Sequence, residues 1–242
     1  MHSLTPVVFG MKHIVGSTTI IFLIIAILML TTNKKYKDQR IVLKISALFL
    51  VFLEIWKYMY IMKETGGIPS YMFPLQLCSF SLYAMPIIAF GGDKIRNLVK
   101  PFGYAIGLIS GFLVLLLPTT VLGSADFWFP YEGDILPYIS FLYHGNMIFF
   151  SLYMIFSKDY KPVWKDAYKA FVILASVALV AGITNLYLGT DFMFLRTGNG
   201  NPIQGILTNF GYIPYILTMI GIGLILMSLV FMPNIKISKK KV

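Results

Sequence analysis

The stretch Ile14–Leu30, IVGSTTIIFLIIAILML, contains no charged residue, and a strongly basic connection follows it. That connection carries Lys34, Lys35, Lys37, Arg40 and Lys44. A membrane-spanning helix needs roughly 20 mostly apolar residues. A signal peptide would carry its positive charge before the apolar core and a cleavage site after it, which is the reverse of this order. We therefore expect a retained membrane helix whose start lies outside the cell.

Six further apolar runs use most of the remaining chain, which is 57% hydrophobic and only 12% charged. Soluble domains contain about 25% charged residues. No alternating strand pattern is present, and only helices or closed barrels satisfy their backbone groups in lipid. We expect an all-α polytopic membrane protein, a bundle of seven transmembrane helices forming one domain over residues 1–242. The expected helices span about 14–30, 42–62, 71–90, 102–122, 135–156, 167–188 and 206–231.

The distribution of Lys and Arg predicts the orientation of this bundle. Sixteen of the 20 basic residues fall in the first, third and fifth connections and the carboxyl-terminal tail, and three fall on the other side. Because Lys and Arg accumulate in cytoplasmic loops, we expect the amino terminus outside and the carboxyl terminus in the cytoplasm. The net charge of +10 then reflects topology, and we expect no nucleic acid as a partner.

Two polar stretches interrupt the apolar runs. One is Phe73–Phe80, FPLQLCSF, which holds a helix-breaking proline, an amide and the protein's single cysteine. The other is Phe141–Asn146, FLYHGN. Polar groups at membrane depth are costly and point to function. These two stretches are therefore the first candidates for a site.

The polar residues inside the runs gather at a common depth. At 1.5 Å per residue, Cys78, His144 and Glu54 each lie roughly 12–13 Å below the outer ends of their runs. Gln76 is about half a turn above Cys78. Three further polar residues lie near the outer ends of their runs, namely His13, Asn185 and Asn209. We expect a shared polar cavity that opens outward or sideways into the outer leaflet.

Within such a cavity, Cys78 could act as a nucleophile with His144 as its base. Glu54 or Asn185 could orient the imidazole. The product would be a thioester on Cys78, resolved by water or by a lipid hydroxyl. The alternative is that Cys78 is a small buried hydrophobic residue and His144 binds a carbonyl. Taken alone, these residues favour that packing role, because free cysteine is among the most buried residue types.

Other chemistries are less well supported. One Cys and three His, without His-x-x-x-His or Cys-x-x-Cys spacing, disfavour a metal site, and we expect no cofactor. Glu54 and Lys57 could form an intrahelical ion pair. A binding or transport protein using the same cavity without covalent chemistry remains an alternative function. A third interpretation is a structural subunit that contacts a partner through the face formed by Gly103, Gly107 and Gly111.

The segments around Pro74–Ser79, around His144 and over Asn185–Leu195 resemble the YwaF family of bacterial integral membrane proteins, which is similar to the animal transmembrane protein 164 family. His13 and Glu54 also match positions where that family has polar residues. The resemblance runs from about His13 to Met232 and implies a multi-pass protein of the bacterial plasma membrane.

This resemblance also implies an activity, namely acyl transfer between phospholipids through a cysteine. More distant relatives hydrolyse lipid esters with a threonine and a histidine. Carried over, Cys78 is the nucleophile and His144 is the base, with membrane lipids as partners and a phospholipid or fatty-acyl group as substrate. Two positions depart from the family pattern: Gln76 replaces a histidine found in some relatives, and Asp191 stands where asparagine is expected. The sequence leaves open whether the chain is an enzyme and what its oligomeric state is.

Overall fold

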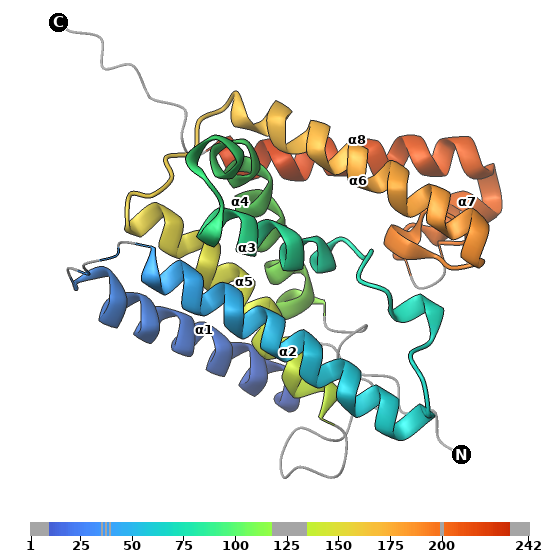
Figure 1. The fold of residues 1–242 in the computed structure, drawn as a ribbon. Helices are drawn as coiled ribbons and strands as arrows, with labels where there is room; N and C mark the ends of the chain where they lie inside the picture. Colours follow the sequence, from blue (N-terminus) through green and yellow to red (C-terminus); the bar gives the residue numbers. More distant parts are fainter. Residues whose placement is uncertain are drawn as a thin grey trace, which may run out of the picture.

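A computed structural model describes residues 10–34, 36, 38, 40–117, 135–198 and 201–232 (Figure 1). Over this part of the chain the secondary structure is helical and contains no strand, so the expected all-α class is confirmed. The helices are α1 (Met11–Thr32), α2 (Ile41–Thr65), α3 (Ser81–Phe90), α4 (Asp93–Leu116), α5 (Leu136–Phe156), α6 (Asp166–Leu188), α7 (Gln204–Phe210) and α8 (Tyr212–Phe231). Short 3₁₀ turns are η1 (Ser70–Met72), η2 (Cys78–Phe80) and η4 (Phe192–Phe194). The connection over residues 123–137 combines acidic and aromatic residues, which predicts a lid or rim on the outer surface, but it lies almost wholly outside the described residues.

Five helices of the described chain are long and apolar enough to cross a membrane: α1, α4, α5, α6 and α8. Their outward surfaces are apolar as well. Phe22 and Met29 on α1 are 69% and 65% exposed, and Leu186 on α6 is 79% exposed. A helix that is apolar on every side belongs in a core or in lipid. The chain is therefore a multi-pass membrane protein.

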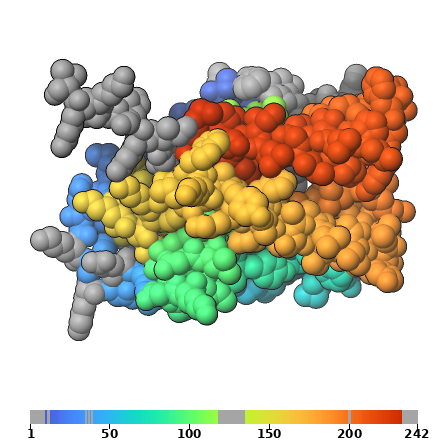
Figure 2. Space-filling model, turned by 90° about the horizontal axis from the view of Figure 1, so that it is seen from above, coloured from blue at the N-terminus to red at the C-terminus, as the bar shows by residue number. Residues whose placement is uncertain are grey.

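Helices α4 and α5 form the centre of the bundle. Helix α5 packs against α1, α2 and α4, while α4 also contacts α3, α6 and α8. Helices α6 and α8 lie side by side on the face of α4 remote from α1, as both views show (Figures 1 and 2). Helix α5, at this centre, carries His144, one of the site residues expected from the sequence.

The glycine face of α4 packs inside this bundle. A Cβ atom on Gly103 would collide with Ile88 of α3, and one on Gly107 would collide with Ser151 of α5. On Gly111 it would meet the His144 carbonyl oxygen at 3.0 Å. Small residues let helix backbones approach closely. The close approach is confirmed, but the interpretation of this face as a partner contact is wrong, because the chain's own helices cover it.

The third apolar run differs most from expectation. Instead of one helix over 71–90, it forms η1, an irregular stretch and η2 before α3 begins at Ser81. Phe73 adopts φ −54° and ψ 142°, the extended conformation that a following proline imposes. Pro74 also has no N–H to donate to a helical turn. Hydropathy identified an apolar segment here, while local proline chemistry prevents a continuous helix.

Two other boundaries were misplaced. Helix α4 begins at Asp93 rather than near residue 102, directly after Gly91 and Gly92 end α3. The seventh run divides at Gly211, whose φ of +90° favours glycine. Pro214 therefore lies in the first turn of α8, where a missing N–H is tolerated.

The α1–α2, α3–α4 and α5–α6 connections meet at one end of the molecule, which we call the basic end. Arg40 binds Asp93 at 2.7 Å across two of these connections. Arg96 and Lys100 are buried within α4, not in a loop as expected. Arg96 donates to both carboxylate oxygens of Asp159 at 2.8 and 3.1 Å, and Lys100 lies 3.2 Å from Oδ2. Paired charges allow these cations to lie inside a helix bundle.

Candidate functional site

A cavity of about 260 Å³ lies between α2, the η1–η2 segment and α5. It brings together four of the seven residues singled out from the sequence: Glu54, Gln76, Cys78 and His144. The remaining lining residues are Lys57, Tyr71, Met72, Phe73, Ser79, Leu136, Ile139, Ser140 and Tyr143. The two polar stretches therefore face one another across a common space.

His144 has one free ring nitrogen. Its Nδ1 lies 2.7 Å from the carbonyl oxygen of Ser140, one turn earlier on α5. A carbonyl can only accept, so Nδ1 must donate and carries the hydrogen. In the neutral ring Nε2 then holds a lone pair, and this atom is buried without a hydrogen-bond partner in the described structure. The geometry presents a hydrogen-bond acceptor to the cavity.

Cys78 is half-buried at the start of η2. Because the run is broken at Pro74, the chain returns to helical geometry only at Leu77, one residue before Cys78. Cys78 lies within a turn that is closed by the Ser79 N–H on the Gln76 carbonyl at 2.9 Å. Since Nε2 of His144 has no partner, the thiol is not hydrogen-bonded to it. Catalytic hydrogen bonds in unliganded sites often tighten only when substrate binds.

Glu54 and Lys57 place a charge pair on the same cavity. The Lys57 ammonium donates to Glu54 Oε1 at 2.6 Å, and the Glu54 side chain is only 5% exposed. The intrahelical pair considered from the sequence is therefore present. Lys57 also lies 5.0 Å from the centroid of the Tyr58 ring, which favours a cation. The sequence had assigned Lys57 to an ion pair only, and the structure adds it to the cavity wall.

Tyr143 is a cavity residue that the sequence reasoning missed. Its ring makes an edge contact with His144 at a centroid distance of 5.5 Å. Its hydroxyl is buried and has no hydrogen-bond partner within the described structure. The available signal was its position next to His144 inside a polar stretch. A buried hydroxyl of this kind can donate to a bound oxygen.

Asn185 lies outside the cavity and organises the loop after α6. Its side chain accepts from Phe192 N–H at 2.7 Å and from the Thr190 hydroxyl at 2.9 Å, and it donates to the Phe192 carbonyl at 3.0 Å. Gln76 reaches the same loop, accepting from Met193 N–H at 2.8 Å. Gln76 thus links the cavity wall to the loop that Asn185 holds.

The remaining predicted residues are also elsewhere. His13 Nε2 lies 2.8 Å from the Leu115 carbonyl at the end of α4, and Asn209 is exposed on α7. Asp191 accepts from the Arg196 and Thr197 N–H groups at 2.8 and 3.1 Å. His13 and Asp191 thus hold the end of a helix and a loop, and none of the three residues lines the Cys78 cavity.

The TMEM164 family model matches residues 8–232. The chain belongs to the TMEM164 family. The resemblance drawn from the Cys78 and His144 segments is thereby confirmed at the level of the family. No match was found among curated proteins or solved structures. The match covers every residue of the cavity in this TMEM164 family member.

Proposed function

We propose that this TMEM164 family member is a membrane-embedded lipid acyltransferase or lipid-ester hydrolase, with Cys78 as nucleophile and His144 as base. The observation that carries the proposal is the free Nε2 of His144 in a cavity that Cys78 also lines. A nucleophile and a base must share such a space.

In the first step the Cys78 thiol gives its proton to Nε2 of His144, and the thiolate sulfur attacks the acyl carbonyl carbon of a lipid ester. The carbon–oxygen bond to the lipid alcohol then breaks. His144 returns the proton to the departing alkoxide, leaving a lysolipid and a thioester on Cys78.

In the second step water or the hydroxyl of another lipid attacks the thioester. His144 accepts the proton of that oxygen and returns it to the Cys78 sulfur. Water gives a fatty acid, whereas a lipid hydroxyl gives a new ester. Ser140 keeps the hydrogen on Nδ1 throughout, as the hydrogen bond between them requires.

Glu54 and Lys57 supply the charge environment of the cavity. We infer that the Lys57 ammonium, which has three donors, attracts the phosphate of a phospholipid headgroup while remaining paired with Glu54. Gln76 and Asn185 support the site indirectly through the loop at Met193.

We further propose that α2 and the η2–α3 segment complete seven membrane passes and that the basic end faces the cytoplasm of a bacterial cell. The clustering of cationic residues at that end supports this orientation. Under it the Cys78 cavity opens toward the outer leaflet.

The decisive experiment uses the single thiol of the chain. The purified protein is incubated with mixed phospholipids and its intact mass is measured for wild type, Cys78→Ala and His144→Ala. We expect a fatty-acyl increment on wild type, removed by hydroxylamine and missing from both variants. An unmodified wild-type chain, with a thiol that resists alkylation until the protein is denatured, would make Cys78 a packing residue.

The buried Glu54–Lys57 pair favours a second candidate, a binding or transport protein for a charged small molecule or lipid. Charges inside membrane proteins commonly mark ligand pathways. This candidate predicts that Cys78→Ser binds lipid as wild type does, whereas Glu54→Gln abolishes binding. The acyl-enzyme mechanism predicts that Cys78→Ser loses turnover even when binding persists.

A further inference from the structure

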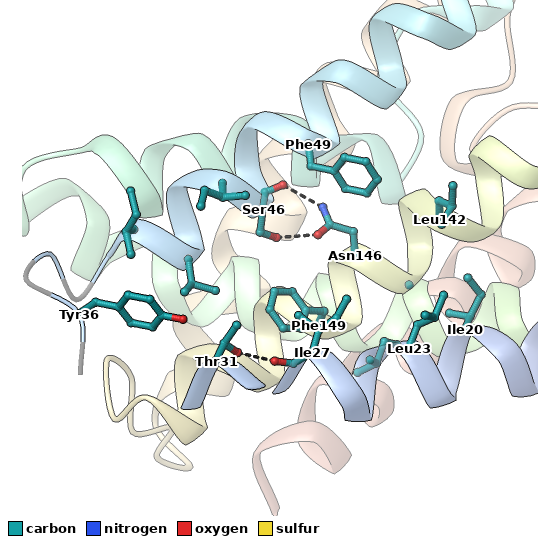
Figure 3. Close-up of a pocket in the computed structure, with 15 residues that line it drawn as sticks. Ile20, Leu23, Ile27, Thr31, Tyr36, Ser46, Phe49, Leu142, Asn146 and Phe149 are labelled. Atoms are coloured by element: carbon teal, nitrogen blue, oxygen red, sulfur yellow. Dashed lines mark hydrogen bonds between the residues drawn. The ribbon is translucent and has the colours of Figure 1, made fainter. Parts of the chain in front are cut away.

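A second cavity, of about 360 Å³, lies between α1, α2 and α5 and shares no lining residue with the Cys78 cavity (Figure 3). Its walls are almost entirely aliphatic and aromatic. Leu23 and Ile27 come from α1, Phe49 from α2, and Leu142 and Phe149 from α5. Its volume is within the range of about 300–1,000 Å³ found for small-molecule sites.

The packing of α1 creates this space. At its amino-terminal end α1 is tied to α4, because His13 Nε2 and the Ser17 hydroxyl both contact the Leu115 carbonyl, at 2.8 and 3.0 Å. Midway along, Ile20 lies directly on Gly145 of α5, where any side chain would collide with it. Beyond that contact the cavity lies between α1, α2 and α5.

The few polar groups of the cavity largely satisfy one another. The Ser46 hydroxyl donates to Asn146 Oδ1 at 2.7 Å, and Asn146 Nδ2 donates to the Ser46 carbonyl at 2.9 Å (Figure 3). The Thr31 hydroxyl donates to the Ile27 carbonyl at 2.6 Å. A polar ligand would find few free donors here. Apolar cavities of even about 150 Å³ stay dry and bind apolar molecules.

The position of the cavity identifies the apolar molecule. Both α1 and α2 expose large apolar side chains beside it, including Ile27 at 43% and Ile45 at 60%, so the surrounding medium is lipid hydrocarbon. Thr31 and Tyr36 line the cavity where the α1–α2 connection begins, next to Lys34. The connection that carries Lys34 would give the phosphate of a lipid bound here a cationic residue at that end, and the acyl chain would lie along Leu23 and Ile27.

We propose that this cavity is a specific binding site for one acyl chain of a phospholipid from the leaflet at the basic end. The site is built from α1, α2 and α5 and is separate from the reaction proposed for Cys78. The bound acyl chain fills the space between α1 and helices α2 and α5. Because it lies between helices of the bundle, it differs from the lipid that surrounds any membrane protein.

The test uses the full-length protein in vesicles of phosphatidylcholine and phosphatidylglycerol containing a trace of phospholipid with a diazirine in one acyl chain. After illumination, labelled peptides are mapped by mass spectrometry. We expect labelling concentrated on the cavity residues of α1, α2 and α5, well above the labelling of the freely exposed Leu186 region of α6.

Two variants fill the cavity from its lipid side, Ile27→Trp and Ile45→Trp, and Leu186→Trp is the matched control on α6. Cavity labelling is expected to fall about tenfold in either filling variant, the affinity lost with roughly two buried methylene groups. It should stay at the wild-type level in Leu186→Trp. Labelling that follows exposed area on every helix, or that survives both filling variants, would overturn the proposal and leave only surrounding lipid. The Cys78 acyl increment is scored separately, so either proposal can fail alone.

Discussion

A histidine bound through one nitrogen to a backbone carbonyl has a defined tautomer, and this governs what His144 can do. The Ser140 carbonyl fixes the hydrogen on Nδ1, so Nε2 is left as the acceptor in a cavity that Cys78 also lines. The bond is local, one helical turn long, and survives any rearrangement that keeps α5 intact. The sequence reasoning selected both residues as candidates because a polar residue inside an apolar run is conspicuous at any depth.

Asn185 gives the first prediction at the residue scale. Asn185→Ala removes the partners of Phe192 N–H, the Phe192 carbonyl and the Thr190 hydroxyl. Each buried polar group left unpaired costs about 1–3 kcal/mol. We expect a marked fall in the thermal unfolding midpoint in detergent, with Cys78 acylation retained in the folded fraction.

The matched control is Asn209→Ala, because Asn209 is exposed on α7 and its loss should leave the unfolding midpoint unchanged. Wild-type stability in Asn185→Ala together with lost acylation would instead give Asn185 a direct part in the chemistry. The sequence could not separate these roles, since both require a polar residue near the end of a helix.

At the scale of elements, the stretch between η1 and α3 shows where hydropathy and helix formation diverge. Phe73 and Pro74 break the run, and this break lets Gln76 reach the Met193 N–H. A window of apolar residues reports burial, not backbone conformation. Pro74 was recognised as a kink or a start, but how far the irregular stretch extends depends on the loop beyond α6, which sequence spacing does not reveal.

The glycine face of α4 yields a prediction for an element pair. In Gly107→Ala the new methyl group would collide with Ser151 and lie 2.9 Å from the Met147 carbonyl oxygen. Overpacking of this kind costs about 1–3 kcal/mol, so we expect a lower unfolding midpoint. Gly221→Ala on α8 is the control, because nothing lies within 4 Å of its Cβ position.

At Gly221 the better helix propensity of alanine, about 1 kcal/mol, should leave stability unchanged or slightly raised. Equal effects at the two glycines would show that α4 and α5 are not in close contact. Thermal unfolding of the two variants in the same detergent makes the comparison.

For the whole molecule, six of the seven expected helices are present, one of them divided at Gly211. Four of the seven polar residues that were expected to share a cavity do so, namely Glu54, Gln76, Cys78 and His144. This shared cavity was predicted from the equal depths of the residues along their helices, and the depth of Cys78 was calculated along a helix that does not form. Cys78 nevertheless lines the same cavity as Glu54 and His144, because the η1–η2 segment forms one wall of it. The burial of Arg96 and Lys100 could not be inferred, since their partner Asp159 lies 59 residues or more away along the chain.

This ionic cluster supports a prediction about the assembled bundle. Asp159→Asn leaves two buried cations without their carboxylate, and breaking a buried pair from one side costs about 3–5 kcal/mol. We expect a large loss of thermal stability. Asp38→Asn is the control, because the Asp38–Lys44 pair is exposed and exposed pairs contribute little to stability.

The control has a defined pH behaviour as well. The hydrogen bond from Lys44 lowers the pKa of Asp38 below its ordinary range. A depressed folded pKa means that the pair's small contribution is present above the unfolded pKa and is lost as pH falls through the folded value. Near neutral pH the Asp38 carboxylate is therefore charged and its pair with Lys44 is present, so the unfolding midpoints are compared there. Similar losses for Asp159→Asn and Asp38→Asn would show that the buried cluster is not structural.

The proposed orientation of the bundle rests on the same basic end and can be measured directly. In a Cys78→Ser background, Asn33→Cys places a thiol on the exposed α1–α2 connection, and Gly67→Cys places one after α2 where no atom lies within 4 Å of the new Cβ. Cationic loops remain on the cytoplasmic side during insertion. An impermeant maleimide added to intact cells should therefore label Gly67→Cys alone, and both variants should react once the membrane is broken. Labelling of Asn33→Cys alone in intact cells would invert the topology and move the entrance of the Cys78 cavity to the inner leaflet, so the lipid pool available for acyl transfer would change with it.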